Sequence, residues 1–470
     1  MPKQSRNMDT LRSRSWLLHS LTRISNLAWP VLPPRAERKQ HVLRNAIVIL
    51  YFDFLWGLGF SMCFHNTVLT GCLKSLGAYQ ILVGLVPGLY YGLYSLVQPL
   101  STFWIKPRRG RLGLTVLLYS GAAISYVAMG SALIWLPVGM VIPRIAAVFA
   151  FMLICLLGMG LADPHYVAMV METIHPEWRG RFYALKGAVL GIGWIVGSVV
   201  FKGIMDRIGV ITNYGVALFV GGLTIILASL VWSRFHEHHG SCERIDRQRL
   251  GAYLHHLFLR FRSIPGFGRF VMCTGVFTAM GGISGYANTY VRDFLSETER
   301  IDGVLSIAFA LSSVAGSLLF GVLTSAVSFR RAYAVGALCI ALGFSVMVAT
   351  DLAVSEEIVM ADGLGKVLAV AGYFLISLWL PAQIVCAFNL CMRVAHKAPA
   401  AEAYAAMSLS VLLFRFSGPV VSSWIIDQWP SCQKAVFVCA AAISFILAML
   451  MVTWLHDPMD RGKLSIQKEQ

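Results

Sequence analysis

Charged residues are scarce in this chain, and acidic residues are the scarcer kind. Only 13% of the 470 residues are Asp, Glu, Lys or Arg, and 23 acidic residues stand against 39 basic ones. A soluble globular domain carries roughly 25% charged residues. The chain is instead 57% hydrophobic, with a mean hydropathy of +0.68. This balance excludes an ordinary soluble protein and indicates a membrane protein.

Motifs for nucleotide hydrolysis, thiol chemistry and metal binding are also missing. No Gly-x4-Gly-Lys-Ser/Thr sequence occurs, so we expect no ATP hydrolysis by this chain. The ten cysteines form no Cys-x-x-Cys pair, and the histidines at 236–239 are interpreted as part of a polar linker rather than a metal site. We find no nucleophile triad. The sequence therefore predicts no catalytic residue, no cofactor and no metal.

Long apolar runs follow one another from about residue 43 to about residue 456. Each approaches the ~20 residues that a helix needs to cross ~30 Å of hydrocarbon. A helix also satisfies its own backbone hydrogen bonds in lipid. We predict an all-α integral membrane protein with twelve transmembrane helices. The expected spans are 44–69, 79–104, 113–135, 141–171, 182–205, 211–233, 268–291, 304–327, 331–351, 366–391, 403–426 and 434–455.

The chain repeats itself at an offset of 221–222 residues. Glu172 to Asp206 aligns without a gap on Arg393 to Asp427, and Asn66-Thr67 falls on Asn288-Thr289. A long-period repeat in a membrane chain is typical of transporters, in which two similar bundles rock about a shared central site. We therefore predict two pseudo-symmetric six-helix bundles. The expected division is a basic N-terminal segment 1–42, a bundle 43–233, a linker with an amphipathic helix 234–267, a second bundle 268–456 and a tail 457–470.

The basic residues, Lys186 counted among them, gather in the loops that follow even-numbered spans. Acidic clusters lie in the odd-numbered loops, and one of them includes Asp293 and Asp302. The positive-inside rule then predicts that both termini and the linker are cytoplasmic. We expect a multi-pass protein of the plasma membrane, or of the inner membrane in a Gram-negative bacterium. Because the positive charge is spread over many loops, we expect contact with anionic lipid and no nucleic-acid partner. We expect a monomer.

The loop after the fourth span carries a family resemblance. Glu172-Thr173-Ile174-His175-Pro176-Glu177-Trp178-Arg179-Gly180-Arg181 resembles the corresponding loop of the major facilitator superfamily, in which an acidic residue precedes Pro-Glu-x-Arg-Gly-Arg. Pro164 lies where many members have a helix-4 proline. The resemblance covers roughly residues 43–456 and implies twelve helices, alternating access and gating loops. The implied gating residues are Glu172, Arg179, Gly180, Arg181, Arg108, Arg109, Arg330 and Arg331.

Other sequence motifs of that family are only partly present in this chain. The loop after helix 2 usually reads Gly-x-x-x-Asp-Arg-x-Gly-Arg-Arg, but its aspartate position is Phe103 in the first half and Ser325 in the second. Antiporters of the family tend to carry Gly-Pro in helix 5. This chain has no proline there, and Gly418-Pro419 stands at the equivalent place in helix 11. The pattern favours symport or uniport over antiport.

Two ionisable residues fall deep within predicted spans, where a charge is expensive. Asp53 lies about nine residues into the first span, or ~14 Å along the axis. It resembles a proton-coupling site, with a structural ion pair as the alternative. Arg415 lies about twelve residues into the eleventh span, or ~18 Å. It is expected either to hold an anionic solute or to pair with Asp53 or Asp163 as a structural or gating contact.

Further polar residues are candidates for the transport path. Asp163 and His165 flank Pro164 in the fourth span and suggest a proton relay or gate, with a capped kink as the alternative. His65, Asn66 and Asn288 lie near the ends of spans one and seven. They suggest an outer gate or a hydrogen-bonding wall, and ordinary helix-end satisfaction explains them equally well. Further candidates for solute contact are Gln98, Gln383 and Asn389.

These features predict a secondary active transporter of a small solute, working by alternating access and coupled to protons as a symporter, or acting as a uniporter. One deep arginine and many aromatic residues suit a small polar or weakly anionic solute. An exporter of drugs or metabolites by proton antiport is the alternative within transport. A sensor that keeps the transporter fold without flux is the alternative outside it.

Overall fold

The computed structural model describes residues 40–104, 111–137, 139–175, 179–237, 249–298, 300–358, 361–394 and 400–455. Within these ranges it contains twelve helical segments that are long and apolar enough to cross a membrane, and no strand. The predicted all-α fold with twelve spans is therefore confirmed.

The first half of the chain supplies six spans, of which the first is interrupted. Its helices are α2 (Gln40–Ser61), η2 (His65–Leu69) and α3 (Thr70–Ser75) in span one, then α4 (Gln80–Trp104), α5 (Arg111–Trp135), α6 (Val141–Thr173), α7 (Arg179–Arg207) and α8 (Thr212–Trp232).

The second half supplies the other six, with interruptions in spans ten and eleven. Its helices are α10 (Phe267–Phe294), α11 (Arg300–Ala326), α12 (Phe329–Ser355), the series η4 (Ala361–Gly365), α13 (Lys366–Ser377), α14 (Trp379–Ala382), η5 (Gln383–Ala387) and α15 (Phe388–Val394), the pair α16 (Ala400–Ser410) and α17 (Leu412–Gln428), and finally η6 (Pro430–Cys432) with α18 (Gln433–Thr453).

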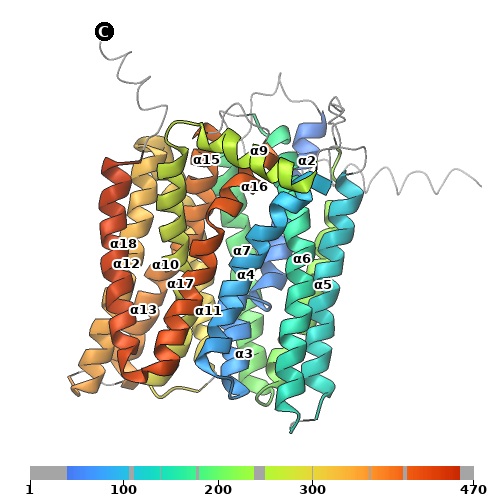
Figure 1. The fold of residues 1–470 in the computed structure, drawn as a ribbon. Helices are drawn as coiled ribbons and strands as arrows, with labels where there is room; N and C mark the ends of the chain where they lie inside the picture. The colour runs from blue at the N-terminus through green and yellow to red at the C-terminus, as the bar shows by residue number, and fades with distance from the viewer. Residues whose placement is uncertain are drawn as a thin grey trace, which may run out of the picture.

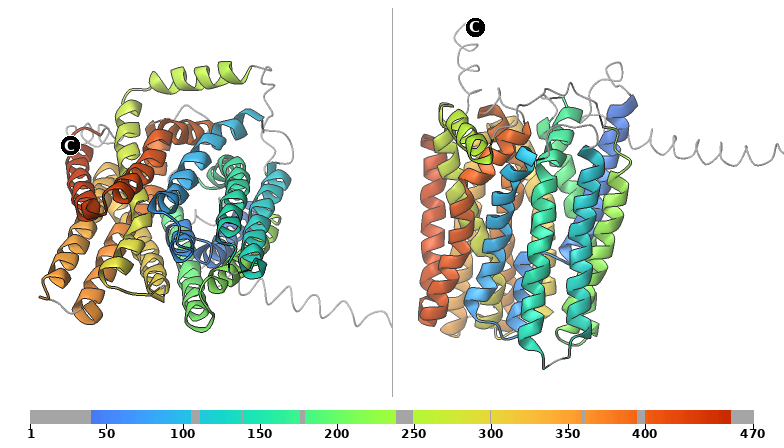
Figure 2. Two further views of the ribbon diagram at one scale, coloured as in Figure 1. Left: turned by 60° about the horizontal axis from the view of Figure 1, so that its bottom comes forward. Right: turned by 45° about the vertical axis from the view of Figure 1, so that its right-hand side comes forward.

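The two halves stand side by side as bundles of roughly parallel rods. In Figure 1 the first half, blue to green, is on the right, and the second half, yellow to red, is on the left. Across the interface α7 packs along α11, and α4 packs along α17. A further helix, α9 (Leu250–Arg262), lies across one end of the bundle, as both views in Figure 2 show. We call this the α9 end, and the opposite end, which holds α3, the far end.

The first span is not the uninterrupted helix that the sequence predicts over 44–69. The α-helix stops at Ser61, and the backbone of Phe64 is extended (φ −64°, ψ 123°). A π-helical turn then runs from His65 to Leu69 before α3 begins. π-turns are uncommon and often mark functional positions. The residues where the helix stops, Met62 to Phe64, are apolar and include no glycine or proline, so the sequence carries no breaker signal there.

Close helix packing holds α7 in place between the two halves. A Cβ atom on Gly193 would overlap the carbonyl oxygen of Phe54 in α2. Small residues allow such backbone approach in membrane bundles, where burial of apolar surface does not drive association. The side chains of α7 that face the interior are fixed relative to α2 as a result.

Candidate functional site

A cavity of about 230 Å³ lies between the two halves. Residues of α2, η2, α4, α5, α6 and α7 line it from the first half, and residues of α10, α14, η5, α15, α16 and α17 line it from the second. Aromatic side chains dominate the wall, since 14 of its 26 residues are Phe, Tyr or Trp. The charged residues of the wall are Asp53, Asp163, Lys186 and Arg415.

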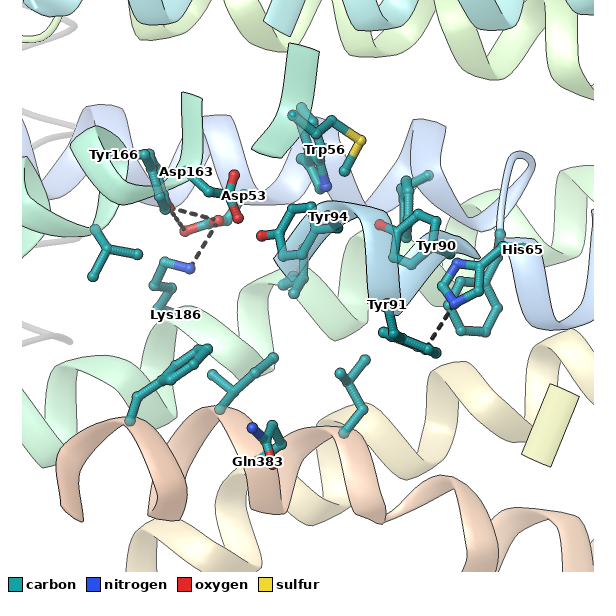
Figure 3. Close-up of a pocket in the computed structure, with 18 of the residues that line it drawn as sticks. Asp53, Trp56, His65, Tyr90, Tyr91, Tyr94, Asp163, Tyr166, Lys186 and Gln383 are labelled. Atoms are coloured by element: carbon teal, nitrogen blue, oxygen red, sulfur yellow. Dashed lines mark hydrogen bonds and ion pairs between the residues drawn. The ribbon is translucent and has the colours of Figure 1, made fainter. Parts of the chain in front are cut away.

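Asp53 joins three helices at the cavity wall. The Lys186 ammonium in α7 lies 3.2 Å from Asp53 Oδ1, and the Tyr166 hydroxyl in α6 donates to the same oxygen at 3.1 Å (Figure 3). The Lys186 nitrogen also lies over the Tyr166 ring, 5.2 Å from its centre. Sequence reasoning placed Lys186 among the basic loop residues. In the structure it lies inside α7 and is the partner of the buried carboxylate.

Asp163 is close to this pair but has a neutral partner. The Tyr119 hydroxyl in α5 donates to Asp163 Oδ1 at 2.6 Å. Figure 3 shows Asp163 beside Asp53 at the end of the cavity that holds Lys186. His165 is buried but is not part of the cavity wall. Side chains two residues apart on an α-helix point about 200° away from each other, so Asp163 and His165 face opposite sides of α6. The geometry does not bring the two together as a proton relay.

Arg415 faces the cavity without a carboxylate partner among the described residues. Its Nη1 donates to Ser95 Oγ at 2.7 Å, which links α17 to α4 in the other half. Ser95 Oγ in turn donates to the Tyr91 carbonyl oxygen at 2.6 Å. The expected ion pair with Asp53 or Asp163 is not made. The guanidinium therefore keeps a buried positive charge that this wall does not neutralise directly.

The polar residues at the break in span one divide into two groups. His65 lines the cavity, where its Nε2 lies 2.7 Å from the Tyr91 hydroxyl and its ring stacks on Tyr90 with centres 3.5 Å apart. Asn66 and Asn288 instead lie in the contact between the halves. Asn66 Nδ2 donates to the Ser284 hydroxyl at 3.3 Å, and Asn288 Nδ2 donates to the Thr67 carbonyl at 3.4 Å.

The remaining polar candidates also differ in position. Gln383 is part of the wall, and its Oε1 accepts a hydrogen bond from Tyr333 at 3.0 Å. Gln98 is buried outside the wall and donates to the Tyr404 hydroxyl at 3.4 Å, which joins the two halves. Asn389 donates to a carbonyl of its own span, that of Val385, at 2.7 Å, and is not part of the wall. Of the three, only Gln383 reaches the cavity.

Polar contacts also join the two halves at the far end. Lys74 Nζ lies 3.2 Å from an Asp293 oxygen, and the Tyr214 hydroxyl donates to Asp302 Oδ2 at 2.8 Å. The Arg292 guanidinium lies 3.6 Å from the same Asp302 oxygen. Sequence reasoning treated these acidic residues as loop charges. Their partners lie in distant segments, which no local pattern predicts.

At the α9 end, Glu172 in the last turn of α6 binds Arg111. Arg111 donates to both Glu172 oxygens, at 3.1 and 3.0 Å, and its Nε donates to Glu237 at 3.0 Å. Of the predicted gating residues, Arg330 donates to the Leu455 carbonyl at 3.2 Å. Arg331 and Arg181 are exposed. Arg179 and Gly180 begin α7, and Arg108-Arg109 lie outside the described residues.

Helix α9 touches both halves at this end. Its Arg260 donates to Glu402 in α16 at 2.8 Å. Its Tyr253 hydroxyl lies 2.8 Å from the Thr102 hydroxyl in α4. Partial burial raises the pKa of the Tyr253 phenol, so its hydroxyl remains protonated around neutral pH. The helix therefore bridges α4 of the first half and α16 of the second.

Two six-helix halves around a central cavity with buried charges define the architecture of a secondary transporter. The chain belongs to the Major Facilitator Superfamily, whose family model matches residues 54–415. Structural likeness agrees with this. A mutant of the nucleoside transporter NupG superposes with a TM-score of 0.63 at 12% identity, over 87% of this chain and 98% of its own. The xylose transporter XylE from E. coli gives a TM-score of 0.61 at 15% identity, over 89% and 99%.

A curated relative matches over a short region. The niacin transporter NiaP of Acinetobacter baylyi is 32% identical over 89 residues, which is 19% of this chain and 19% of the relative. The match therefore spans less than a quarter of that transporter's length. The similarity is limited to that region.

Proposed function

We propose that this chain moves a small, weakly anionic solute by alternating access through the central cavity, as a proton-coupled symporter. A uniporter, in which the solute crosses without a proton, is the alternative to this coupling. The observation that carries it is the Asp53–Lys186 ion pair, which lies in the cavity wall at 3.2 Å. A buried pair of this kind changes its net charge when one proton is bound. Protonation therefore changes the electrostatic free energy of a charged solute in the same cavity.

The ion pair supplies a two-state element for coupling. With Asp53 ionised, the carboxylate attracts Lys186 and joins α2 to α7. A proton on Asp53 removes that attraction and leaves the ammonium without a carboxylate partner at this contact. Because breaking a buried pair costs about 3–5 kcal/mol, proton binding can shift the balance between two arrangements of the helices. Asp163, held by a neutral tyrosine, is the second carboxylate that can take the proton.

The solute is proposed to lie between Arg415 and the polar residues His65 and Gln383 of the wall. Arg415 offers a guanidinium that can bind an anionic oxygen. The short similarity to a niacin transporter supports a small organic solute. The cavity volume of about 230 Å³ is below the range typical of pockets for drug-sized ligands. This favours a small solute over the exporter of large drugs.

We also propose an orientation and a setting. The α9 end carries Arg111, Arg260 and Arg330, and positive charge gathers on the cytoplasmic side of membrane proteins. This end, with both termini, is therefore placed in the cytoplasm of a plasma membrane or bacterial inner membrane. The exposed arginines of this end, Arg181, Arg262 and Arg331, are expected to contact anionic lipid. We propose that the monomer is the working unit, because the cavity is formed within one chain.

Flux measurements in proteoliposomes test the proposal. The purified chain is reconstituted, and uptake of small organic acids, sugars and amines is measured with and without an imposed proton gradient. We expect accumulation of one class, driven by an acidic outside. Asp53→Asn is expected to abolish this accumulation. Solute binding without flux would identify a sensor instead. Accumulation driven by an acidic interior would instead identify an antiporter.

A further inference from the structure

We infer that the solute is a planar aromatic monocarboxylate. This inference rests on the proposed function, since it assigns the occupant of the same cavity. Four features of the wall lead to it: an arginine without a carboxylate partner among the described residues, the sum of the wall charges, the identity of the wall atoms that lack a hydrogen-bond partner, and the aromatic faces contributed by both halves.

Arg415 selects for a carboxylate. Its guanidinium is buried, and one nitrogen is used by Ser95 at 2.7 Å. A guanidinium presents five N–H groups in one plane, so several remain for a second partner. A carboxylate matches this fork with two parallel hydrogen bonds, whereas a neutral amide or hydroxyl does not. Among the described residues no carboxylate occupies this position, and an incoming one would be the first to pair with the charge.

Among anionic solutes, the sum of the wall charges favours one that carries a single negative charge. Lys186 and Arg415 carry +2, and Asp53 and Asp163 carry −2 when both are ionised, so the empty wall is neutral. A monocarboxylate adds −1, and one proton on either aspartate restores neutrality. A dicarboxylate would require two protons. Because uncompensated charge is expensive at this depth, one proton and one monoanion enter together at least cost.

The unsatisfied atoms of the wall select for an acceptor-rich solute. Four wall side chains have a buried polar atom without a hydrogen-bond partner within the described part of the chain, and all four atoms are nitrogens. Trp194 Nε1, Trp379 Nε1 and Gln383 Nε2 are donors, and His65 Nδ1 takes either role according to its tautomer. Buried donors without partners are costly. These side chains line the cavity, so a carboxylate, or a ring nitrogen in an aromatic acid, offers an acceptor to those donors that turn toward it.

The aromatic faces select for a flat ring. Tyr90 and Tyr94 in α4 lie nearly parallel, with interplanar angle 10° and ring centres 6.1 Å apart. From the other half, Trp379 meets Tyr91 edge-on with centres 5.5 Å apart, so the wall rings of the two halves touch. Figure 3 shows Tyr90, Tyr91 and Tyr94 along one side of the pocket, with Gln383 on the opposite helix. A flat ring gains stacking from such walls that a saturated ring does not.

Matched ligands separate these requirements in a binding experiment. The purified full-length chain is titrated with benzoate, pyridine-3-carboxylate, benzamide, cyclohexanecarboxylate and phthalate. The readout is isothermal titration calorimetry, supported by tryptophan fluorescence. We expect the two aromatic monocarboxylates to bind at least tenfold more tightly than benzamide, cyclohexanecarboxylate and doubly ionised phthalate. Equal binding of benzoate and benzamide, or of benzoate and cyclohexanecarboxylate, would overturn the inference.

Variants assign the effect to Arg415. Arg415→Gln is expected to weaken benzoate binding at least tenfold and to leave benzamide binding within threefold of wild type. Arg207→Gln, which changes an exposed arginine in the last turn of α7, is the matched control and should change neither. If Arg415→Gln fails to fold, Arg415→Lys keeps the charge without the planar fork and should lose part of the preference. An unchanged benzoate preference in a folded variant would contradict the assignment.

The outcomes distinguish this inference from the proposed function. If all five ligands fail to bind while another solute class is accumulated, the aromatic assignment is wrong and the transporter proposal stands. If benzoate binds as expected but no solute crosses the membrane under any gradient, the cavity assignment stands and the transporter proposal is wrong.

Discussion

Lys186 in α7 lies 3.2 Å from the carboxylate of Asp53 in α2, and both residues are at least nine-tenths buried. The pair joins two helices of the same half at the wall of the cavity. The repeat does not reproduce it, because the equivalent of Lys186 at offset 221 is Met407. The two halves are therefore alike in fold and unlike in charge, and the proposed coupling pair belongs to the first half alone.

Removal of Lys186 alone should be more damaging than removal of both members of the pair. Lys186→Gln leaves Asp53 buried without a cation, which costs about 3–5 kcal/mol of unfolding free energy. The double variant Asp53→Asn/Lys186→Gln removes the uncompensated charge and should recover most of that loss. Reversible unfolding in mixed micelles measures the difference.

The matched control for this cycle lies on the same helix. Near the end of α7, Lys202 pairs with Asp206, which lies one helical turn after it, and both side chains are 38% exposed. Lys202→Gln should cost less than about 1 kcal/mol, as exposed pairs do. An equal loss from Lys186→Gln and Lys202→Gln would show that the Asp53 pair has no special energetic role.

The twelve spans could be predicted from the long apolar runs of the sequence. The two-half organisation could be predicted from the internal repeat. Asp53, Arg415 and His65 could be identified because polar residues are conspicuous in apolar runs, and all three line the cavity. Lys186 was missed for a physical reason. It lies seven residues after Arg179, roughly 10 Å into α7. At that depth a lysine near basic loop residues looks like part of the cytoplasmic charge.

The contacts between the halves could not be predicted in the same way. Asn66 and Asn288 were noticed because they occupy equivalent positions of the repeat, but their partners, Ser284 and Thr67, depend on how the halves dock. The pairing of Tyr214 with Asp302 joins residues 88 positions apart. Local patterns carry no information about such distant contacts.

Weakening the far end should expose a native cysteine. Cys72 in α3 is fully buried, and its neighbour Gly71 packs against the Asp302 carboxylate. Tyr214→Phe and Asp302→Asn remove the 2.8 Å contact between the halves, so this end should open more often. We expect labelling of Cys72 by a membrane-impermeant maleimide to rise several-fold, as measured by mass spectrometry. Cys432, partly exposed in η6 at the same end, should label equally in all variants; unchanged labelling of Cys72 would contradict a closing role for this contact.

The contacts of α9 should influence the rate of turnover. Arg260→Glu places a negative charge against Glu402, where the structure has a 2.8 Å ion pair. The two side chains are partly exposed, so the effect on stability should be at most about 1 kcal/mol. We expect a few-fold change in the initial rate of uptake, and its recovery in Arg260→Glu/Glu402→Arg. Arg262→Glu on the same helix is the control. A failure of the swapped pair to recover the rate would mean that the ion pair itself is unimportant.

Close packing of α7 on α2 should make Gly193 intolerant of a side chain. A Cβ atom at Gly193 would overlap the Phe54 carbonyl, whereas one at Gly203 on the same helix meets no atom within 4 Å. Gly193→Ala should lower the unfolding free energy by about 1–3 kcal/mol, as overpacking does. Gly203→Ala should be neutral or slightly stabilising, because alanine favours helix. Equal effects of the two substitutions on unfolding in mixed micelles would argue against the packing shown here.

Solute-driven proton movement tests the central claim most directly. Proteoliposomes containing a pH-sensitive dye are prepared without any proton gradient, and the transported solute is added outside. If the Asp53–Lys186 pair couples the two fluxes, the solute gradient will acidify the interior of wild-type vesicles, while Asp53→Asn vesicles will show no acidification. Equal acidification by wild type and Asp53→Asn, or solute entry into wild-type vesicles without any proton movement, would contradict the account.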